Sequence, residues 1–509
     1  MRITHRRRPA AISVALLALA LTAACTTSEA SPQPGDGPQI AVVPGKTPSP
    51  AAKPDDGDAT PITLTTAHRR KSGKTIALGG DDAPYNYAPS VLLDGGRYRM
   101  WWCSQLGAAR PPGDDILTAE SRSMDGPFAA GRKRAVPVFS GKPGSFDGVH
   151  TCDPSVIRVS GLYYMYYTGA AGDHDHGNAI GLATSHDGRS WTRVNDGKPL
   201  IRSARHVSNG NTYGAGQPSA LYLGGKFYLM FTDTTGDGTG HNGAGQFVLR
   251  SPDATFSKDV EALGEDGFKK VGDTGTRERT IVDAFSADWM WVDSLAAFAI
   301  AHETREGTTI TFWDIDFRTN PYERLLLPGA WREGPGLVRR PDGHAVVSAA
   351  DPCGTVAIDL VRATHEGRHG PSDLRHYGVD VGGFDACKST GRALLALDGF
   401  AMPSPQRTID LVVKGALVRI DRRTVAEKLA VRVLDERVAA LDKVDVAAHL
   451  KPGDVVLTAP ERGTGFVFDD RLWAFGSADV AELNSSRVDE LSDDEWDGYE
   501  RGPDLDPPR

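Results

Sequence analysis

The chain of 509 residues is long enough for more than one domain and a large hydrophobic core. Hydrophobic residues make up 40% of it and 57 residues are glycine, which favours a turn-rich globular protein over a helical bundle. The formal net charge of −9 argues against a nucleic-acid or anionic-membrane surface, because no excess of Lys and Arg is present to meet phosphates.

The N-terminus reads as an export signal. A basic start, MRITHRRRP, precedes the apolar run AAISVALLALAL, which is too short for a permanent membrane span. The small residues of TAAC before Cys25 resemble the lipobox of bacterial lipoproteins, although Thr22 stands where a branched aliphatic residue is usual. We therefore expect a lipoprotein signal peptide over 1–25 with lipidation at Cys25, and an ordinary cleaved signal is the alternative. The following stretch, rich in Pro, Ser and Gly, predicts a flexible linker over 26–75.

After the linker, a sequence motif recurs about every 65 residues. The stretches YNYAPSVLLDGGRYRMWW, HTCDPSVIRVSGLYYMYYTG and GAGQPSALYLGGKFYLMFTD each place Pro-Ser before a short apolar strand, a glycine turn and a second strand. The residue before Pro-Ser varies, and is Ala88, Asp153 or Gln217. A turn signal in SRSMDGPF, ATSHDGRSW and LRSPDATF keeps the same interval. Repeats of this length with several strands each are typical of β-propeller blades.

Extending the period predicts two more repeats. RTIVDAFSADWMWVDSLAAFAIAH would place Asp283 at the variable position, and WREGPGLVRRPDGHAVV would place Glu333 there. The expected fold is therefore all-β, with a five-bladed β-propeller over 76–365. The region 366–509 leaves the pattern, and its mixed helix and hairpin signals predict a small α+β accessory region with a disordered end. It is similar to small accessory repeats of exported actinobacterial wall proteins.

The variable position is the best candidate for a functional site. In a propeller it lies just before the innermost strand of each blade, so Asp153, Asp283 and Glu333 should converge at one mouth of the central channel. Carboxyl groups at close range push their pKa values apart, which is what acid–base cleavage of a glycosidic bond requires. The expected contacts to sugar hydroxyls and sugar rings come from Asn86, Tyr87, Tyr213, Gln217 and Trp331. Each candidate also has a purely structural reading, as a turn cap, a solvated turn residue or part of the core.

One family carries these motifs. CDPSVIRVSGLYYMYYTG resembles the blade motif of the five-bladed β-propeller glycoside hydrolases, above all family 43 and its relatives in families 62 and 32, and REGPGLVRRPDG resembles another piece of them. The resemblance implies inverting hydrolysis of arabinose- or xylose-type linkages, with Asp153 as general base and Glu333 as general acid. Asp283 would then tune or orient the acid. Ala88 stands where the family's base would stand, so either the roles are redistributed around the ring or the constellation differs.

Four cysteines remain once the signal is removed, and an even number in an exported chain predicts two disulfides. Cys103 and Cys152 belong to neighbouring repeats and plausibly join them, which leaves Cys353 and Cys387 to pair by elimination. The cysteines have no CxxC spacing and the histidines and aspartates of GDHDHGN read as a solvated loop, so no metal site is expected. A structural calcium ion, as some family 43 enzymes hold, stays open, and no other cofactor is expected.

Two functions from different classes follow. The first is an exported glycoside hydrolase, tethered by lipid to the outer face of the cell membrane, monomeric, and acting on an oligo- or polysaccharide. The second is a glycan-binding propeller lipoprotein that has lost catalysis, which the non-acidic Ala88 and Gln217 favour.

Overall fold

The computed structural model describes residues 60–79, 85–105, 113–172, 177–205, 212–240, 243–366, 372–476 and 479–506. The expected signal peptide, its lipidation site Cys25 and residues 173–176 of the GDHDHGN loop lie outside these ranges. Within the described ranges, no helix is long and apolar enough to cross a membrane.

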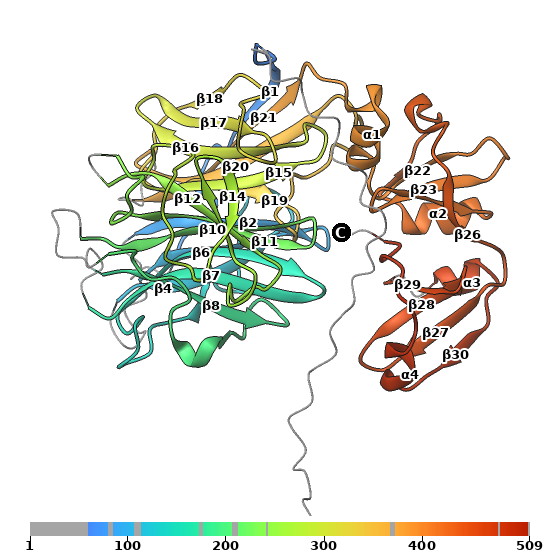
Figure 1. Ribbon diagram of the computed structural model, residues 1–509, viewed down its shortest axis with the longest axis horizontal. Coiled ribbons are helices and arrows are strands. Elements are labelled where there is room, and N and C mark those ends of the chain that lie inside the picture. Colours follow the sequence, from blue (N-terminus) through green and yellow to red (C-terminus); the bar gives the residue numbers. More distant parts are fainter. Residues whose placement is uncertain are drawn as a thin grey trace, which may run out of the picture. The chain divides into compact units, whose positions relative to one another are not determined.

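The described chain is mostly β-strand, arranged in several sheets in which most neighbouring strands are antiparallel (Figure 1). The first sheet contains β2 (Asn86–Asp94), β3 (Arg97–Ser104), β4 (Asp115–Ser121) and β5 (Val136–Phe139). The second contains β6 (His150–Val159), β7 (Leu162–Ala170), β8 (Ala179–Ser185) and β9 (Thr192–Arg193). The third contains β10 (Ala215–Leu223), β11 (Lys226–Asp233), β12 (Gln246–Ser251), β13 (Glu261–Gly264) and β14 (Gly267–Lys270). The fourth contains β15 (Ala287–Val292), β16 (Ala297–Thr304), β17 (Gly307–Trp313) and β18 (Leu325–Pro328).

The last group of strands joins distant parts of the chain. It contains β19 (Gly336–Arg339), β20 (Val356–Thr364), β21 (Asp373–Gly382) and, as its outer strand, β1 (Thr65–Lys71). β1 pairs antiparallel with β21, which covers an otherwise open sheet edge. The expected bounds of 76–365 therefore need correction at both ends, because β1 lies in the predicted linker and β21 lies beyond 365.

The first strands of the sheets form a closed ring. β2 contacts β6, β6 contacts β10, β10 contacts β15, and β15 contacts β19. β19 then pairs in parallel with β2, with Val338 opposite Val91, so the first and last groups are continuous. The ring explains why one motif recurs, because the start of each first strand faces the same centre.

Large aromatic side chains fill the spaces between the sheets. Trp101, Trp102, Tyr166, Tyr167 and Trp289 are all less than 2% exposed. Most of the aromatic residues that crowd the repeated strands are therefore core, since their packing supplies the apolar burial that holds neighbouring sheets together.

The C-terminal region repeats one arrangement twice. After α1 (Thr390–Ala396), the first copy has β22 (Phe400–Pro403), β23 (Ile409–Val413), β24 (Ala416–Ile420), α2 (Arg423–Leu429) and β25 (Arg432–Val433), with β26 (Val446–Leu450) added at its edge. The second has β27 (Val455–Ala459), β28 (Gly463–Phe468), β29 (Arg471–Phe475), α3 (Val480–Leu483) and β30 (Val488–Glu490), followed by α4 (Asp493–Asp497). In both copies the strand after the helix returns parallel to the first strand.

Both expected disulfides are present. Cys103 is bonded to Cys152 with Cα atoms 5.0 Å apart, and Cys353 is bonded to Cys387 with Cα atoms 5.4 Å apart. The first joins β3 to β6 and therefore ties together two neighbouring sheets of the ring. Two disulfides indicate an exported protein, because thiols stay reduced in most cytosols.

Candidate functional site

The Pro-Ser motif bends each first strand at the same point. Ala88, Asp153 and Gln217 have positive φ angles of 46°, 49° and 52°, and in each strand the pairing register shifts across this residue and the proline after it. Such a bulge re-aims the side chain that carries it. The three residues line one hollow at the centre of the ring.

The other two ring positions differ from expectation. Ser286, rather than Asp283, lines the hollow in the fourth sheet, and Asp283 is exposed. Gly334 takes the place in the last group, with a φ of 43° like its counterparts, so Glu333 precedes the ring position by one residue. Both differences have one cause: the connecting loops differ in length, so a constant period does not locate the ring position in every sheet.

A buried arginine lines the same hollow. Arg339 of β19 is fully buried and forms an ion pair with Asp288 at 3.2 Å. Its guanidinium also donates to the backbone carbonyls of Ala220 and Trp289, each at 3.0 Å. Sequence reasoning missed this pair, although Asp288 stands where the first three repeats have the serine of Pro-Ser, which was the available signal.

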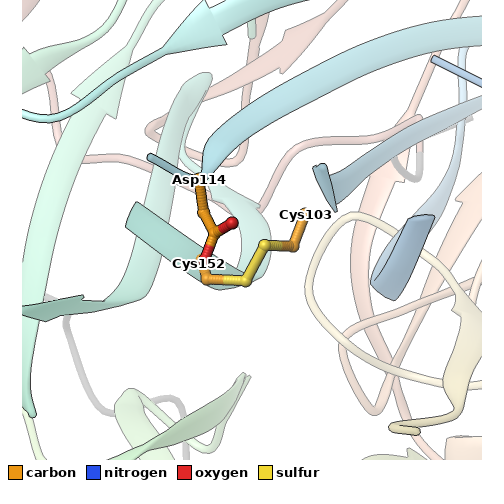
Figure 2. Close-up of side chains that lie close together, drawn as sticks. All are labelled: Cys103, Asp114 and Cys152. Atoms are coloured by element: carbon orange, nitrogen blue, oxygen red, sulfur yellow. A yellow bond between two sulfur atoms is a disulfide. The ribbon is translucent and has the colours of Figure 1, made fainter. Parts of the chain in front are cut away.

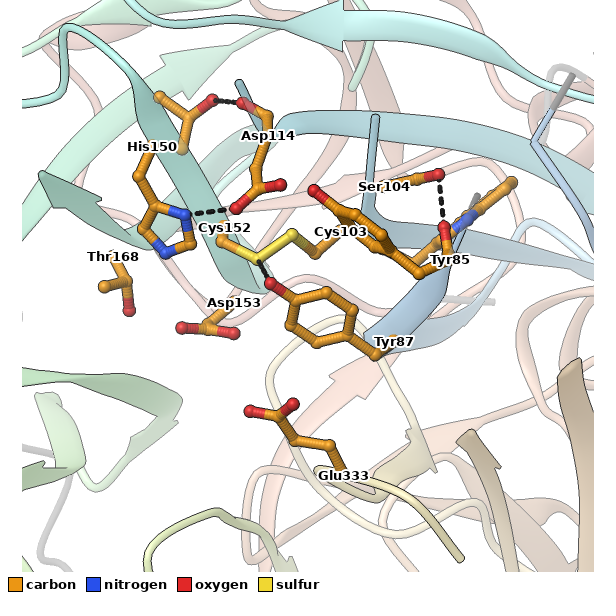
Figure 3. The surroundings of a disulfide bond; sticks show 12 residues. Tyr85, Tyr87, Cys103, Ser104, Asp114, His150, Cys152, Asp153, Thr168 and Glu333 are labelled. Atoms are coloured by element: carbon orange, nitrogen blue, oxygen red, sulfur yellow. Dashed lines mark hydrogen bonds and ion pairs between the residues drawn. A yellow bond between two sulfur atoms is a disulfide. The ribbon is translucent and has the colours of Figure 1, made fainter. Parts of the chain in front are cut away.

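Asp153 and Glu333 lie near each other, close to Tyr87 (Figure 3), and interact electrostatically. The Tyr213 hydroxyl lies 3.5 Å from Oδ2 of Asp153, and Nε2 of Gln217 lies 3.5 Å from both that hydroxyl and Oε1 of Glu333. These are long contacts, at the limit of a hydrogen bond. The Ser286 hydroxyl donates to Oε1 of Gln217 at 2.8 Å, which orients the amide with its nitrogen toward the acids.

Burial and mutual repulsion shift the titration of both acids. Burial and, after it, the neighbouring Asp153 together raise the pKa of Glu333 to about 7. Burial also raises the pKa of Asp153, while His150 and a hydrogen bond from Thr168 act against that rise. Oδ1 of Asp153 has no hydrogen-bond partner. Two such carboxyl groups can hold one proton between them near neutral pH, which is the condition for an acid and a base in one site.

A histidine–aspartate pair stands directly beside these acids, and sequence reasoning missed it. Nδ1 of His150 forms an ion pair with Oδ2 of Asp114, as Figure 3 shows. A ring nitrogen of His150 and a carboxylate oxygen of Asp153 lie within 4.8 Å of each other. The signal was present in HTCDPS, where His150 begins the same strand as Asp153.

The Cys103–Cys152 disulfide lies against the same residues (Figure 2). A carboxylate oxygen of Asp114 is within 4.8 Å of both sulfurs, and the Tyr87 hydroxyl is 2.9 Å from Sγ of Cys152. Two groups of described residues have metal-ligand spacing, and both include Cys152. Because metal binding requires a thiolate and this sulfur is in a disulfide, neither group is a ligand set.

The residues expected to contact sugar differ in their surroundings. Asn86 is buried and its Oδ1 accepts from the Gly79 N–H and from Trp102 Nε1, so the amide oxygen is already used within the protein. Tyr213 and Gln217 lie between the two acids, as described above. Trp331 stands two residues before Glu333 in the sequence. It is 37% exposed, and its Nε1 donates to the Thr304 carbonyl at 2.8 Å.

No family model matches the chain. The curated relatives that match are two uncharacterized proteins of Mycobacterium tuberculosis, MT1551 and Rv1502, each 28% identical over 180 residues. The match covers 35% of this chain and 54% of each relative, so the chain spans about half the length of the curated relatives it matches.

Solved structures show distant likeness. Zg3597, a family 117 glycoside hydrolase of the marine bacterium Zobellia galactanivorans, is 12% identical, with a TM-score of 0.43 over 63% of this chain and 91% of its own. The α-L-arabinofuranosidase PaAbf62A of Podospora anserina is 12% identical, with a TM-score of 0.38 over 63% of this chain and 98% of its own. At these TM-scores the likeness carries no argument about what this chain does.

Proposed function

We propose that the ring is a five-bladed β-propeller and that its mouth is the active site of a glycoside hydrolase of the family 43 type. The observation that carries this proposal is the pairing of the buried Asp153 with the partly buried Glu333, two carboxyl groups that interact electrostatically. Burial raises the pKa of Glu333 to about 7. Cleavage of a glycosidic bond uses one carboxyl group that is still protonated near neutral pH and a second carboxyl group beside it.

In this mechanism each carboxyl group has one role. The Asp153 carboxylate takes a proton from a water molecule as the water oxygen attacks the anomeric carbon. Glu333 gives its proton to the glycosidic oxygen as the bond from that oxygen to the anomeric carbon breaks. The products are two free sugar hydroxyls, and direct attack by water inverts the anomeric centre. The Tyr213 hydroxyl and the Gln217 amide would hold sugar hydroxyls between the two acids.

The proposed substrate is an arabinose- or xylose-containing oligo- or polysaccharide. It follows the resemblance of the Asp153 and Glu333 motifs to family 43 enzymes. Asp283 has no part in this version, because it is exposed and Ser286 takes its ring position. We place the protein on the outer face of the cell membrane, as a monomer held there by lipid on Cys25. The two disulfides support the export that this location requires.

A glycan-binding protein without catalysis is the second candidate. It is favoured by the ring positions themselves, since Ala88, Gln217, Ser286 and Gly334 carry no acid and Asp153 alone does. A sugar held by tyrosine, glutamine and serine in this hollow would need no proton transfer.

The deciding experiment is hydrolysis by the mature chain of nitrophenyl arabinofuranoside, xyloside, galactoside and mannoside, and of arabinan and arabinoxylan. Asp153→Asn and Glu333→Gln test the pair, and Asp283→Asn is a matched Asp→Asn control on an exposed residue. Loss of about 100-fold or more in both site variants, with full activity in the control, supports the hydrolase. Silence on every substrate, with polysaccharide binding retained, overturns it in favour of the binding protein.

A further inference from the structure

His150 is held in a fixed place beside Asp153. It is 4% exposed, it begins β6, and its Nδ1 is paired with Asp114, which lies just before β4. The Thr151 hydroxyl donates to the Asp114 backbone carbonyl at 2.7 Å, which is a second contact between the two segments beside the ion pair. Nδ1 points toward Asp114, and the opposite edge of the imidazole points toward Asp153 and Thr168 (Figure 3).

Acidic groups surround this imidazole. Asp114 faces it from the segment before β4, Asp153 from its own strand, and Glu333 from the segment before β19. Burial lowers the pKa of His150, but the three carboxyl groups outweigh burial and raise it above the ordinary value. Asp153 contributes more to that rise than Glu333 does. The phenol of Tyr213 also faces Asp153, and burial holds its pKa well above the ordinary value, so it stays neutral.

We propose that His150, held by Asp114, is a positioning residue that faces Asp153 as a cation and keeps the Asp153 carboxylate ionised. This inference rests on the proposed hydrolase for its purpose, because a general base must be ionised to accept a proton from water. It also explains how two acids in one site take different roles. The cation opposes the rise that burial causes in the pKa of Asp153, which favours Asp153 as the ionised member of the pair and leaves the shared proton on Glu333.

The arrangement assigns Asp114 a supporting role. Its carboxylate accepts from Nδ1 and so fixes both the orientation of the ring and the proton on Nδ1. The remaining N–H then lies on the nitrogen that faces the site, within reach of a water molecule placed between the imidazole and Asp153. A separation of up to 4.8 Å between the ring nitrogen and the carboxylate oxygen leaves room for a shared hydroxyl or water.

The first test measures the ionisation of His150 and needs no substrate. The imidazole N–H protons and ring signals of the folded chain are followed by NMR as a function of pH, with His150→Gln to assign them. We expect the pKa of His150 to fall by about one pH unit or more in Asp153→Asn, because an opposite charge at this range shifts a pKa by that amount. Asp283→Asn is the matched control and leaves the His150 signals unchanged. A His150 pKa that is the same in Asp153→Asn and in the wild type overturns the inference.

The second test uses activity. Coupling between two sites is reciprocal, so removing His150 must raise the pKa of Asp153 by the amount that removing Asp153 lowers that of His150. In His150→Gln the acidic limb of the kcat/KM profile therefore moves to higher pH, while the matched variant of the exposed His186, His186→Gln, keeps the wild-type profile. An unmoved acidic limb in a folded His150→Gln protein contradicts the inference. If no glycoside is cleaved, the proposed hydrolase fails, and the NMR measurement still decides whether His150 and Asp153 form the charged pair.

Discussion

The Ser155 hydroxyl accepts a hydrogen bond from the backbone N–H of Ala220 at 2.8 Å, so a side chain of one sheet satisfies a main-chain donor of the next. Ser90 does the same for Val156 at 3.0 Å, and Ser219 for Trp289 at 3.4 Å. In the fourth sheet Asp288 takes over and accepts from the Leu337 N–H at 2.7 Å. The serine of Pro-Ser therefore recurs because each first strand uses it to bind its neighbour, which fixes where the variable residue before it points.

Ser155→Ala should lower the free energy of unfolding by about 1–3 kcal/mol, because it leaves the buried Ala220 N–H without a partner. Ser389→Ala is the control, since Ser389 is exposed and makes no side-chain capping bond, and it should change stability by less than about 0.5 kcal/mol. Chemical denaturation of both variants measures the difference. Equal stability of the two would mean that this serine does not tie the sheets together.

Arg339→Met should cost about 3–5 kcal/mol of unfolding free energy, because it leaves the Asp288 carboxylate buried with no cation beside it. The double variant Arg339→Met with Asp288→Asn should recover part of that loss, since the uncompensated charge is gone. Thermal and chemical denaturation of the single and double variants test the pair. A double variant as unstable as the sum of its single variants would show that the charges are not coupled.

Glu333 should make stability depend on pH. Its pKa is about 7 in the folded protein and 4.5 is the ordinary value, so between these two pH values the folded state binds more protons than the unfolded state. Stability should therefore fall as pH rises through this window, by up to about 3 kcal/mol at pH 8 relative to pH 5, and Glu333→Gln should remove that loss. Glu306→Gln, on an exposed turn, is the control and should keep the wild-type dependence. Denaturation at the two pH values gives the comparison, and a wild-type slope in Glu333→Gln would contradict the assignment.

The same pKa predicts the alkaline side of the activity profile. A general acid must carry its proton, so kcat/KM for a cleaved glycoside should fall as pH rises through about 7. Substrates with good leaving groups, such as nitrophenyl glycosides, should retain more activity in Glu333→Gln than natural glycans do, because they need less help from an acid. If Glu333→Gln loses the same factor on both, Glu333 is not the acid.

The Cys103–Cys152 disulfide joins two neighbouring sheets immediately before Asp153. Cys103→Ala with Cys152→Ala should lower the free energy of unfolding by about 2–5 kcal/mol. It should also lower activity in the fraction that remains folded, because the disulfide packs against Asp114 and the strand that carries Asp153. The matching pair Cys353→Ala with Cys387→Ala should affect stability without changing kcat. Loss of kcat in the second pair alone would reverse this assignment.

Local chemistry in the sequence was enough to find the repeated hairpins and the ring positions Ala88, Asp153 and Gln217. Pro-Ser, a glycine turn and an apolar strand are short-range signals, and each specifies its own bulge and hairpin wherever it occurs. The repeats predicted the Cys103–Cys152 disulfide, and the Cys353–Cys387 disulfide followed by elimination; both are present. The sequence also placed Glu333 near the site, although one residue away from the ring position.

Only the tertiary structure decided which residues complete the site. Ser286 replaces Asp283, and Gly334 precedes Pro335, because loops of different lengths carry the chain from one sheet to the next. β1 closes the last sheet from the far end of the chain, and no local pattern marks that pairing. Asp114 meets His150, and Arg339 meets Asp288, from segments that are far apart in the sequence, so only the folded chain brings these charges together. The sequence by itself determined the repeated frame, and the folded ring determined which charged groups face one another within it.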